Sequence, residues 1–278
     1  TRFGDIMAKR AFSFLDMPRR SEKPRVNGMT MCIDQGLGFD FVKGLLEMSS
    51  DYIDLWKLGW TTTQLQPLEL VKKKISLLRS HQISVCNGGT LLELSEHQGK
   101  STELFRELVE MGCDSTEISS GSSEINPARI IELINEAKKH SLRVFCEVGK
   151  KLPEEDYEAE EYNNLLKKFI AAGADKVILE ARESGVSVGI MDDEGSPIID
   201  RLDRVLEGID TSNILFESPK KSQQVFFLKK FGAETSLGNI HPNDAISLET
   251  LRRGMRGDTM NDFYFVIADR HLKKQGKK

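Results

Sequence analysis

Val-Phe-Cys-Glu, at residues 144–147, decides the fold, because three further segments of the sequence repeat its plan. These segments are Ser-Thr-Glu-Ile at 115–118, Val-Ile-Leu-Glu at 177–180 and Ile-Leu-Phe-Glu at 214–217. In each one a β-branched or aromatic run carries a glutamate at or near its end, and a polar loop follows. The glutamates lie 30, 33 and 37 residues apart, which is the length of one strand, one helix and two loops. This repeat predicts an α/β fold, the (β/α)8 or TIM barrel.

The four glutamates are expected to converge, because such barrels carry their chemistry at the C-terminal ends of the strands. Like charges around one cavity repel each other unless a cation or a proton is shared among them. The alternative is that these carboxylates form salt bridges with lysines and arginines of the pocket. A divalent metal site is the first hypothesis, and its candidate ligands are Glu117, Glu147, Glu180 and Glu217.

Length and charge narrow the class of protein. The chain has 278 residues and a formal net charge of −4, so a single barrel with a full core is expected, and a nucleic-acid partner is not. A small anionic substrate in a local basic pocket remains compatible with this charge. No apolar run approaches the roughly 18 residues of a membrane span, and the start lacks the plan of a signal peptide. We therefore expect a cytoplasmic protein without a membrane partner; the sequence leaves open a homo-oligomer.

The cysteines are expected to be buried free thiols. No Cys-x-x-Cys pair is present, and three of the four lie in strand-like runs, where cysteine behaves as a small hydrophobic residue. Disulfides or a soft-metal site are the alternative reading of the same set, which is Cys32, Cys86, Cys113 and Cys146.

Residues 1–28 are predicted to form an N-terminal arm or cap, because they are mostly polar and basic and contain Pro18 and Pro24. The barrel is expected at 29–260, and the lysine-rich tail at 261–278 is expected to be partly disordered. Strands are predicted at 29–34, 52–58, 83–86, 115–118, 142–147, 176–180, 214–217 and 235–238. Helices are predicted at 39–48, 68–80, 101–111, 127–140, 199–206, 222–231 and 244–255, with one more that ends at 173.

Polar residues in the loops that follow the strands are the candidates for substrate contacts. Lys57 lies inside the apolar strand Leu-Trp-Lys-Leu, where a lysine is uncommon unless it meets a carboxylate or an anion. Asp34, at the end of the first strand, is either a helix cap or a pocket residue. The loops at 87–90 and 119–123 contain small residues whose backbone N–H groups suit a phosphate, although ordinary turns have the same composition. Their candidates for substrate binding are Gly88, Thr90, Ser119 and Ser122.

The loops after the fifth, sixth and seventh strands hold further basic and polar residues. In Glu-Val-Gly-Lys-Lys at 147–151 the chain turns after the strand, so Lys150 is expected to reach over the barrel. Arg182 offers a planar guanidinium to a carboxylate or a phosphate, and Ser184 lies in the same loop. Lys220 and Gln223 lie where a helix begins, a position whose free N–H groups favour an anion. The sequence has lysine pairs at 150–151 and 220–221, and solvation at the surface explains one lysine of each pair equally well.

Several of these motifs, in this order, resemble the phosphosulfolactate synthase family. The resemblance covers about residues 26–259 and is carried by the motifs at 57–60, 88–91, 117–123, 147–151, 180–185, 219–224 and 246–259. Lys-Pro-Arg-Val-Asn-Gly-Met-Thr at 23–30 differs from the methanogen enzymes and is more similar to bacterial members and to the related plant heat-stress-associated proteins. Those plant proteins differ more at the site loops, whereas Glu-Val-Gly-Lys-Lys and Lys-Ser-Gln-Gln are intact in this sequence.

The resemblance implies a carbon–sulfur lyase on a (β/α)8 barrel that uses Mg²⁺ to add sulfite to phosphoenolpyruvate, giving (2R)-phospho-3-sulfolactate. It also implies a place in sulfonate metabolism, as the opening step of one coenzyme M pathway. Cations are essential for such a reaction, because two negative reactants must meet. The candidate catalytic residues are Lys150 as the acid, Lys57 as its rival, and Arg182.

Two other readings stay open. In the first, the chain is a non-catalytic, stress-protective or binding barrel that kept the fold. In the second, it is another magnesium enolate enzyme with a different nucleophile. Fold alone does not separate these readings from the lyase, because one fold hosts many functions. The intact set of charged residues at the predicted strand ends favours catalysis.

Overall fold

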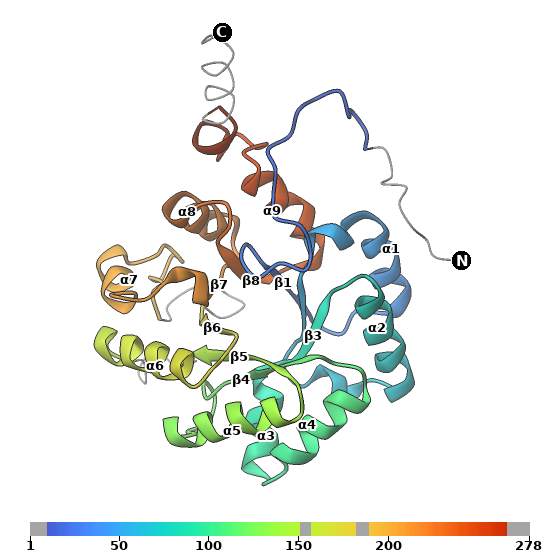
Figure 1. The fold of residues 1–278 in the computed structure, drawn as a ribbon, viewed down its shortest axis with the longest axis vertical. Helices are drawn as coiled ribbons and strands as arrows, with labels where there is room; N and C mark the ends of the chain where they lie inside the picture. Colours follow the sequence, from blue (N-terminus) through green and yellow to red (C-terminus); the bar gives the residue numbers. More distant parts are fainter. Residues whose placement is uncertain (1–9, 151–156, 182–188, 266–278) are drawn as a thin grey trace.

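A computed structural model of the chain describes residues 10–150, 157–181 and 189–265. Eight parallel strands form a nearly closed ring with helices around it, so the predicted (β/α)8 barrel is confirmed (Figure 1). The strands are β1 (Thr30–Asp34), β2 (Leu55–Leu58), β3 (Ser84–Asn87), β4 (Ser115–Ile118), β5 (Arg143–Val148), β6 (Lys176–Leu179), β7 (Ile214–Glu217) and β8 (Ser236–Ile240).

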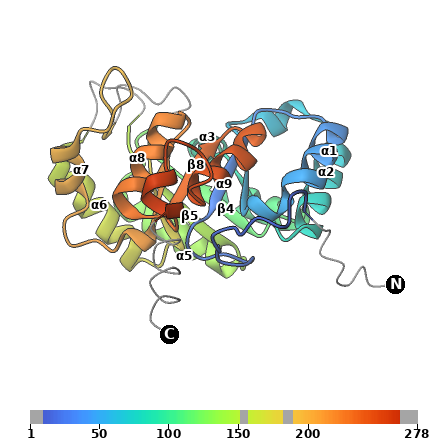
Figure 2. The ribbon, with the colours of Figure 1, turned by 90° about the horizontal axis from the view of Figure 1, so that it is seen from above.

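The α-helices lie outside the ring of strands. They are α1 (Phe39–Ser49), α2 (Leu68–Ser80), α3 (Gly89–His97), α4 (Ser101–Glu110), α5 (Pro127–Lys139), α6 (Ala159–Ala171), α7 (Ile199–Val205), α8 (Lys221–Phe231) and α9 (Ala245–Arg252). In Figure 2 the loop at 189–198, coloured gold, and the N-terminal arm, coloured dark blue, lie on opposite sides of the ring. No helix of the described residues has both the length and the apolar character that crossing a membrane requires.

The core has two layers, which follow from the alternation of side chains along each strand. A small cluster fills the inside of the barrel and comprises Met29, Met31, Leu55, Cys86, Phe145, Ile178 and Leu215. Their neighbours along the strands, such as Trp56, Cys146 and Phe216, point outwards into the larger cluster between strands and helices. All four cysteines are buried free thiols, as expected.

Side chains join the two strands at the ends of the sheet order, β3-β2-β1-β8-β7-β6-β5-β4. The Asn87 carboxamide on β3 donates from Nδ2 to the Glu117 carbonyl at 3.0 Å and accepts from the Glu117 N–H at 3.2 Å. It therefore takes the place that a neighbouring strand's backbone would occupy. Two residues earlier on β4, the Ser115 hydroxyl donates to the Val85 carbonyl at 2.8 Å. These contacts complete the ring and fix the height of β4 relative to β3.

Some expectations about local structure were wrong. The glycines at 87–90 predicted a loop, but α3 begins at Gly89, because the Glu117 carboxylate accepts the Gly89 N–H at 2.7 Å and an anion favours a helix N-terminus. The second strand begins at Leu55 and not at residue 52, because residues 50–52 form a 3-10 turn. Elsewhere the predicted strands at 115–118 and 214–217 and the helix at 68–80 match the structure.

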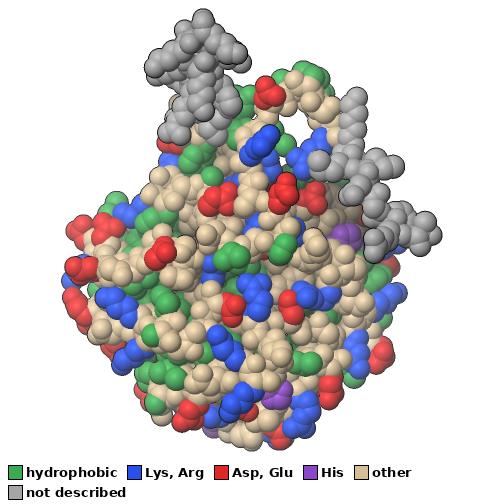
Figure 3. All heavy atoms as spheres, in the orientation of Figure 1, with side chains coloured by type: hydrophobic (Ala, Val, Ile, Leu, Met, Phe, Trp, Pro, Cys, Tyr) green, Lys and Arg blue, Asp and Glu red, His purple; other side chains and the backbone are tan. Residues whose placement is uncertain are grey.

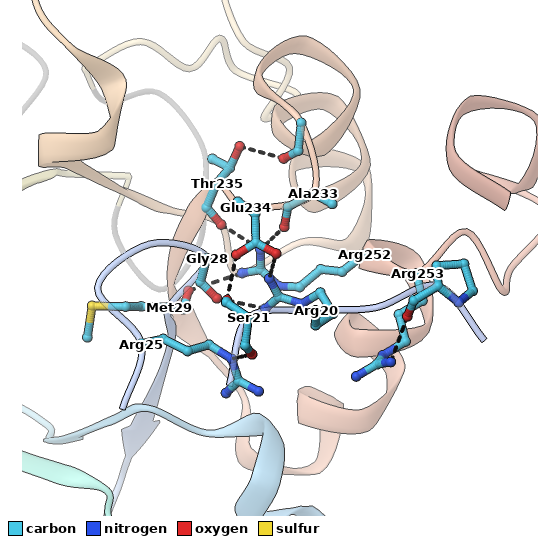
Figure 4. A network of polar contacts seen from close by, with 12 residues as sticks. Arg20, Ser21, Arg25, Gly28, Met29, Ala233, Glu234, Thr235, Arg252 and Arg253 are labelled. Atoms are coloured by element: carbon cyan, nitrogen blue, oxygen red, sulfur yellow. Dashed lines mark hydrogen bonds and ion pairs between the residues drawn. The ribbon is translucent and has the colours of Figure 1, made fainter. Parts of the chain in front are cut away.

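The arm is fastened near the N-terminal ends of β1 and β8, by polar contacts that Figure 4 shows. Arg20 donates to Glu234 at 2.6 Å, to Glu249 at 3.3 Å and to the Gly28 carbonyl at 2.9 Å. Arg252, which is 1% exposed, donates to the carbonyls of Ala233, Thr235 and Met29. The arm, β8 and α9 are thus held together by buried guanidinium groups.

We predict that Arg252→Met destabilises the fold, because three carbonyl groups, two of them in buried contacts, lose a charged donor. The expected loss in the free energy of unfolding is about 2–4 kcal/mol, measured by urea denaturation. Arg106→Met is the control, since Arg106 is exposed on α4, and it should change stability by less than about 0.5 kcal/mol. Equal urea midpoints for the two variants would contradict the role given to Arg252.

Candidate active site

The alternation that fills the barrel with apolar residues also places carboxylates above them. Three inward-facing residues of the core are followed two positions later by a glutamate: Phe145 by Glu147, Ile178 by Glu180 and Leu215 by Glu217. Residues two apart on a strand share a face, so these side chains point to the inside of the barrel at its C-terminal end, here called the mouth. One carboxylate oxygen from each of Glu147, Glu180 and Glu217 lies within 4.8 Å of the others, and all three residues are buried.

Glu117 also lies at the mouth, but outside this group of three. Its Oε2 lies 3.0 Å from the Lys57 ammonium, and its Oε1 accepts the Gly89 N–H. The same ammonium donates to Glu217 Oε1 at 3.0 Å. Lys57 therefore connects β2 with β4 and β7 through the interior of the barrel. For Glu117 the structure shows the salt bridge that was the alternative to metal binding.

The electrostatic setting keeps Lys57 charged. Burial by itself lowers the pKa of Lys57, but the carboxylates of Glu117, Glu217 and Glu147 outweigh burial and hold that pKa well above its usual value. Burial, with Glu147 and Glu217, raises the pKa of Glu117 to about 7 in spite of the Lys57 ammonium. Lys57 is thus a fixed cation and a poor proton donor near neutral pH.

The three grouped carboxylates fit a hard divalent cation. Their donor atoms are oxygens, which Mg²⁺ and Ca²⁺ prefer. Glu147 Oε1 is buried and has no hydrogen-bond partner among the described residues, so it has a free position for a cation or its water. Gly149 makes the close grouping possible: a Cβ atom at this position, where φ is +151°, would lie 2.4 Å from the Cβ of Glu180.

Lys150 lies at the rim of the mouth and is 8% exposed. Its ammonium lies 3.4 Å from the Ser120 carbonyl and 5.4 Å from the centre of the Tyr157 ring. The loop after β4 and the residues before α6 therefore hold it, and the flexible lysine stem lets the ammonium turn towards a ligand in the mouth. Arg182 and Ser184, the other candidates from the neighbouring loop, lie outside the described residues.

The serine loop at 119–123 already binds an anion from the protein itself. The Glu93 carboxylate on α3 accepts the Ser119 hydroxyl at 2.5 Å, the Gly121 N–H at 3.0 Å and the Ser122 N–H at 2.9 Å. These are the donors that the sequence suggested for a phosphate. Sequence reasoning missed Glu93, because it lies in α3, a helix that the sequence analysis did not predict.

The remaining substrate-binding candidates lie at two places. Gly88 packs against backbone: a Cβ atom there would come within 2.4 Å of the Trp60 nitrogen. Thr90 lines a small cavity at the mouth, together with Lys57, Glu117 and Glu147. Lys220 and Gln223 bind the loop at 189–198, donating to the carbonyls of Glu194 at 3.1 Å and Gly195 at 3.0 Å.

Asp34 has a structural task. One of its oxygens accepts the N–H groups of Gly36 and Leu37, and the other contacts Trp56 Nε1 and the buried Lys74 ammonium. It braces the loop after β1 and is not the N-cap of α1, which is Gly38. A larger cavity of about 430 Å³ lies outside the barrel between α2, α3 and α4, and its lining is mostly apolar. It does not contain the mouth glutamates.

Fold and mouth together define a (β/α)8-barrel enzyme with its charged residues at the C-terminal ends of the strands. Residues 18–258 match the family described as (2R)-phospho-3-sulfolactate synthase (ComA). The chain belongs to this family, whose members are carbon–sulfur lyases.

The sequence similarity to these relatives extends over nearly their whole length. The phosphosulfolactate synthase of Methanothermobacter thermautotrophicus is 42% identical over 252 residues, which are 90% of this chain and 97% of that protein. The Bacillus subtilis protein of the same name is 38% identical, over 88% of this chain and 97% of its own. The 3-hexulose-6-phosphate synthase structure from Salmonella typhimurium has a TM-score of 0.52, 14% identity and coverage of 79% and 90%, and it supports the fold alone.

The face of the molecule drawn in Figure 3 gives no indication of a nucleic-acid partner. On the face drawn in Figure 3, basic and acidic side chains intermingle over the described residues. A nucleic-acid backbone would call for a continuous basic surface instead.

We predict that Lys57→Met destabilises the barrel by about 3–5 kcal/mol near pH 8, because two buried carboxylates lose their cation. Without Lys57 the pKa of Glu117 rises further above its unfolded value. A carboxyl group whose pKa is raised in the folded protein favours folding at low pH, where it is protonated, and this contribution is lost as the pH rises through that pKa. The stability difference between Lys57→Met and the wild type should therefore be smaller at pH 5 than at pH 8. Denaturant unfolding at both pH values measures this, with exposed Lys43→Met as the control. A deficit independent of pH would contradict the charge argument.

Proposed function

We propose that this chain catalyses the addition of sulfite to phosphoenolpyruvate, with Mg²⁺ as cofactor, to give (2R)-phospho-3-sulfolactate. The observation that carries the proposal is the group of three buried carboxylates beside a permanently charged lysine, in a chain of this family. A carboxylate-rich mouth would repel anionic reactants, so a bound cation is needed for them to enter.

Glu147, Glu180 and Glu217 would hold the Mg²⁺ ion. When bound, the ion supplies positive charge that stabilises negative charge developing on a substrate carboxylate. Lys57 positions this set by holding Glu217, and its fixed charge lowers the repulsion between the carboxylates and an approaching anion.

The chemistry consists of one bond formation and one proton transfer. The sulfur lone pair of sulfite forms a bond to the methylene carbon of phosphoenolpyruvate, and the electron pair of the double bond moves towards the carboxylate. The carbon that bears the phosphate then accepts a proton, which restores the carboxylate and fixes the handedness of the product. Lys150 is our candidate for the proton donor, because its ammonium lies at the rim and has a flexible stem.

Lys57 was the rival for this role, and we infer that it is the weaker candidate. Its ammonium is enclosed by Glu117 and Glu217, and its raised pKa opposes proton release. Arg182 and Ser184, outside the described residues, stay candidates for binding the phosphate or the sulfite, as do Thr90 at the mouth and Lys220.

Mass spectrometry tests the reaction directly. Purified protein incubated with phosphoenolpyruvate, sulfite and Mg²⁺ should form phosphosulfolactate, excess chelator should abolish it, and added Mg²⁺ should restore it. Glu147→Gln should need on the order of 10–100-fold more Mg²⁺ for half-maximal rate, since it removes a charged ligand. Full turnover in excess chelator would contradict the proposed requirement for Mg²⁺. No sulfonate product at all would favour the non-catalytic barrel, or another nucleophile if phosphoenolpyruvate is still consumed.

The proton donor is tested by two substitutions at one position. Lys150→Ala should lower kcat on the order of 10²–10⁴-fold, with a smaller change in KM, because a positioned acid contributes about this much. Lys150→Arg should be nearly as slow, since a guanidinium keeps the charge but scarcely releases a proton. If Lys150 only neutralises a bound anion, arginine should restore most of the rate and the alanine defect should appear in KM.

A further inference from the structure

Asn239 is a residue of the mouth that the sequence did not single out. It lies near the end of β8, is 6% exposed, and lines the small cavity that also contains Lys57, Glu117 and Glu147. The predicted eighth strand ended at residue 238, so Asn239 lay outside that strand. The strand instead continues to Ile240, which keeps Asn239 within the ring.

The backbone of Asn239 is strained. Its φ is +53°, in the left-handed region that costs most residues roughly 1–2 kcal/mol and that asparagine tolerates better than most. Trp60, which follows β2 and lines the same cavity, also has a positive φ, +51°. Strained residues that share a cavity are typical of sites where the conformation is held for binding. Strain alone does not say what binds.

Two buried oxygens in this cavity indicate the kind of ligand. Asn239 Oδ1 and Glu147 Oε1 are both buried and have no hydrogen-bond partner among the described residues. An oxygen acceptor buried without a donor costs about 1–3 kcal/mol, so a ligand that satisfies both is favoured. The Lys57 ammonium contacts Glu117 and Glu217 instead. The cavity, about 30 Å³, has room for an ion or for very few water molecules.

We infer that Asn239 Oδ1 is a neutral oxygen ligand, direct or through one water, for the divalent cation that Glu147 binds. A fully deprotonated anion does not satisfy these atoms, because it has no hydrogen to donate to an oxygen acceptor. The inference rests on the metal requirement of the proposed function and not on sulfite or phosphoenolpyruvate. It extends the cation site from the ends of β5, β6 and β7 to the end of β8.

The test measures cation binding without substrates. Mn²⁺, used as the probe ion, is titrated by calorimetry into the wild-type protein, Asn239→Gly and Asn239→Asp. Glycine removes the side chain but accepts the positive φ, so this variant should fold; it should bind Mn²⁺ on the order of 10-fold more weakly. Aspartate keeps an oxygen at the same place and should bind Mn²⁺ at least as tightly as the wild type.

Gln82→Gly is the matched control. Gln82 also has a positive φ, +57°, but it is exposed and precedes β3 at the other end of the barrel, so its change to glycine should leave Mn²⁺ affinity unchanged. Equal Mn²⁺ affinity of Asn239→Gly and the wild type would overturn the inference, as would a wild-type protein that binds no Mn²⁺.

A second titration, with phosphoenolpyruvate at saturating Mn²⁺, separates the other possible role of the carboxamide. If Asn239→Gly and Asn239→Asp lose only phosphoenolpyruvate affinity, then the side chain donates to the substrate and the inference is wrong. The result does not depend on product formation. Wild-type protein that binds Mn²⁺ through Asn239 but makes no sulfonate would sustain the inference and refute the proposed function.

Discussion

The mouth of this barrel depends on one ammonium group enclosed by carboxylates. Lys57 lies 3.0 Å from both Glu117 and Glu217, so strands β2, β4 and β7 meet at a single charge. Each such contact is worth about 5 kcal/mol at an effective dielectric constant of 20, while each buried ion loses several kcal/mol of hydration. The two terms are similar in size, so the triad adds little net stability. What it does is fix where the carboxylates point, which leaves Glu147 with an unused oxygen for a ligand.

Period-2 alternation is the reason that so much of this arrangement could be predicted from the sequence. A glutamate two positions after an inward apolar residue lies on the same face of its strand, and the repeat length places the next strand beside it. The spacing of Glu147, Glu180 and Glu217 therefore predicted both the barrel and the convergence of these three side chains. Lys57 was recognisable for a related reason, since a lysine within an apolar strand has to meet a carboxylate or an anion.

The parts that could not be predicted all depend on contacts between distant elements. Glu93 binds the serine loop only because α3 begins where two glycines predicted a turn, and that start in turn depends on the Glu117 carboxylate. Asn87 replaces a backbone partner between β3 and β4, a role that no local pattern of residues indicates. Asn239 belongs to the mouth because β8 continues two residues further than its apolar pattern suggested.

Buried polar atoms at the two ends of the barrel have different partners. At the end that holds the arm, the three carbonyls near Arg252 all receive a guanidinium donor, which suits a region whose task is stability. At the mouth, oxygens of Glu147 and Asn239 are buried without a hydrogen-bond donor among the described residues. Acceptors of this kind cost stability until a cation or its water satisfies them, so ligand binding and folding are coupled there. The electrostatic cost of the mouth thus lies where a charged ligand can offset it.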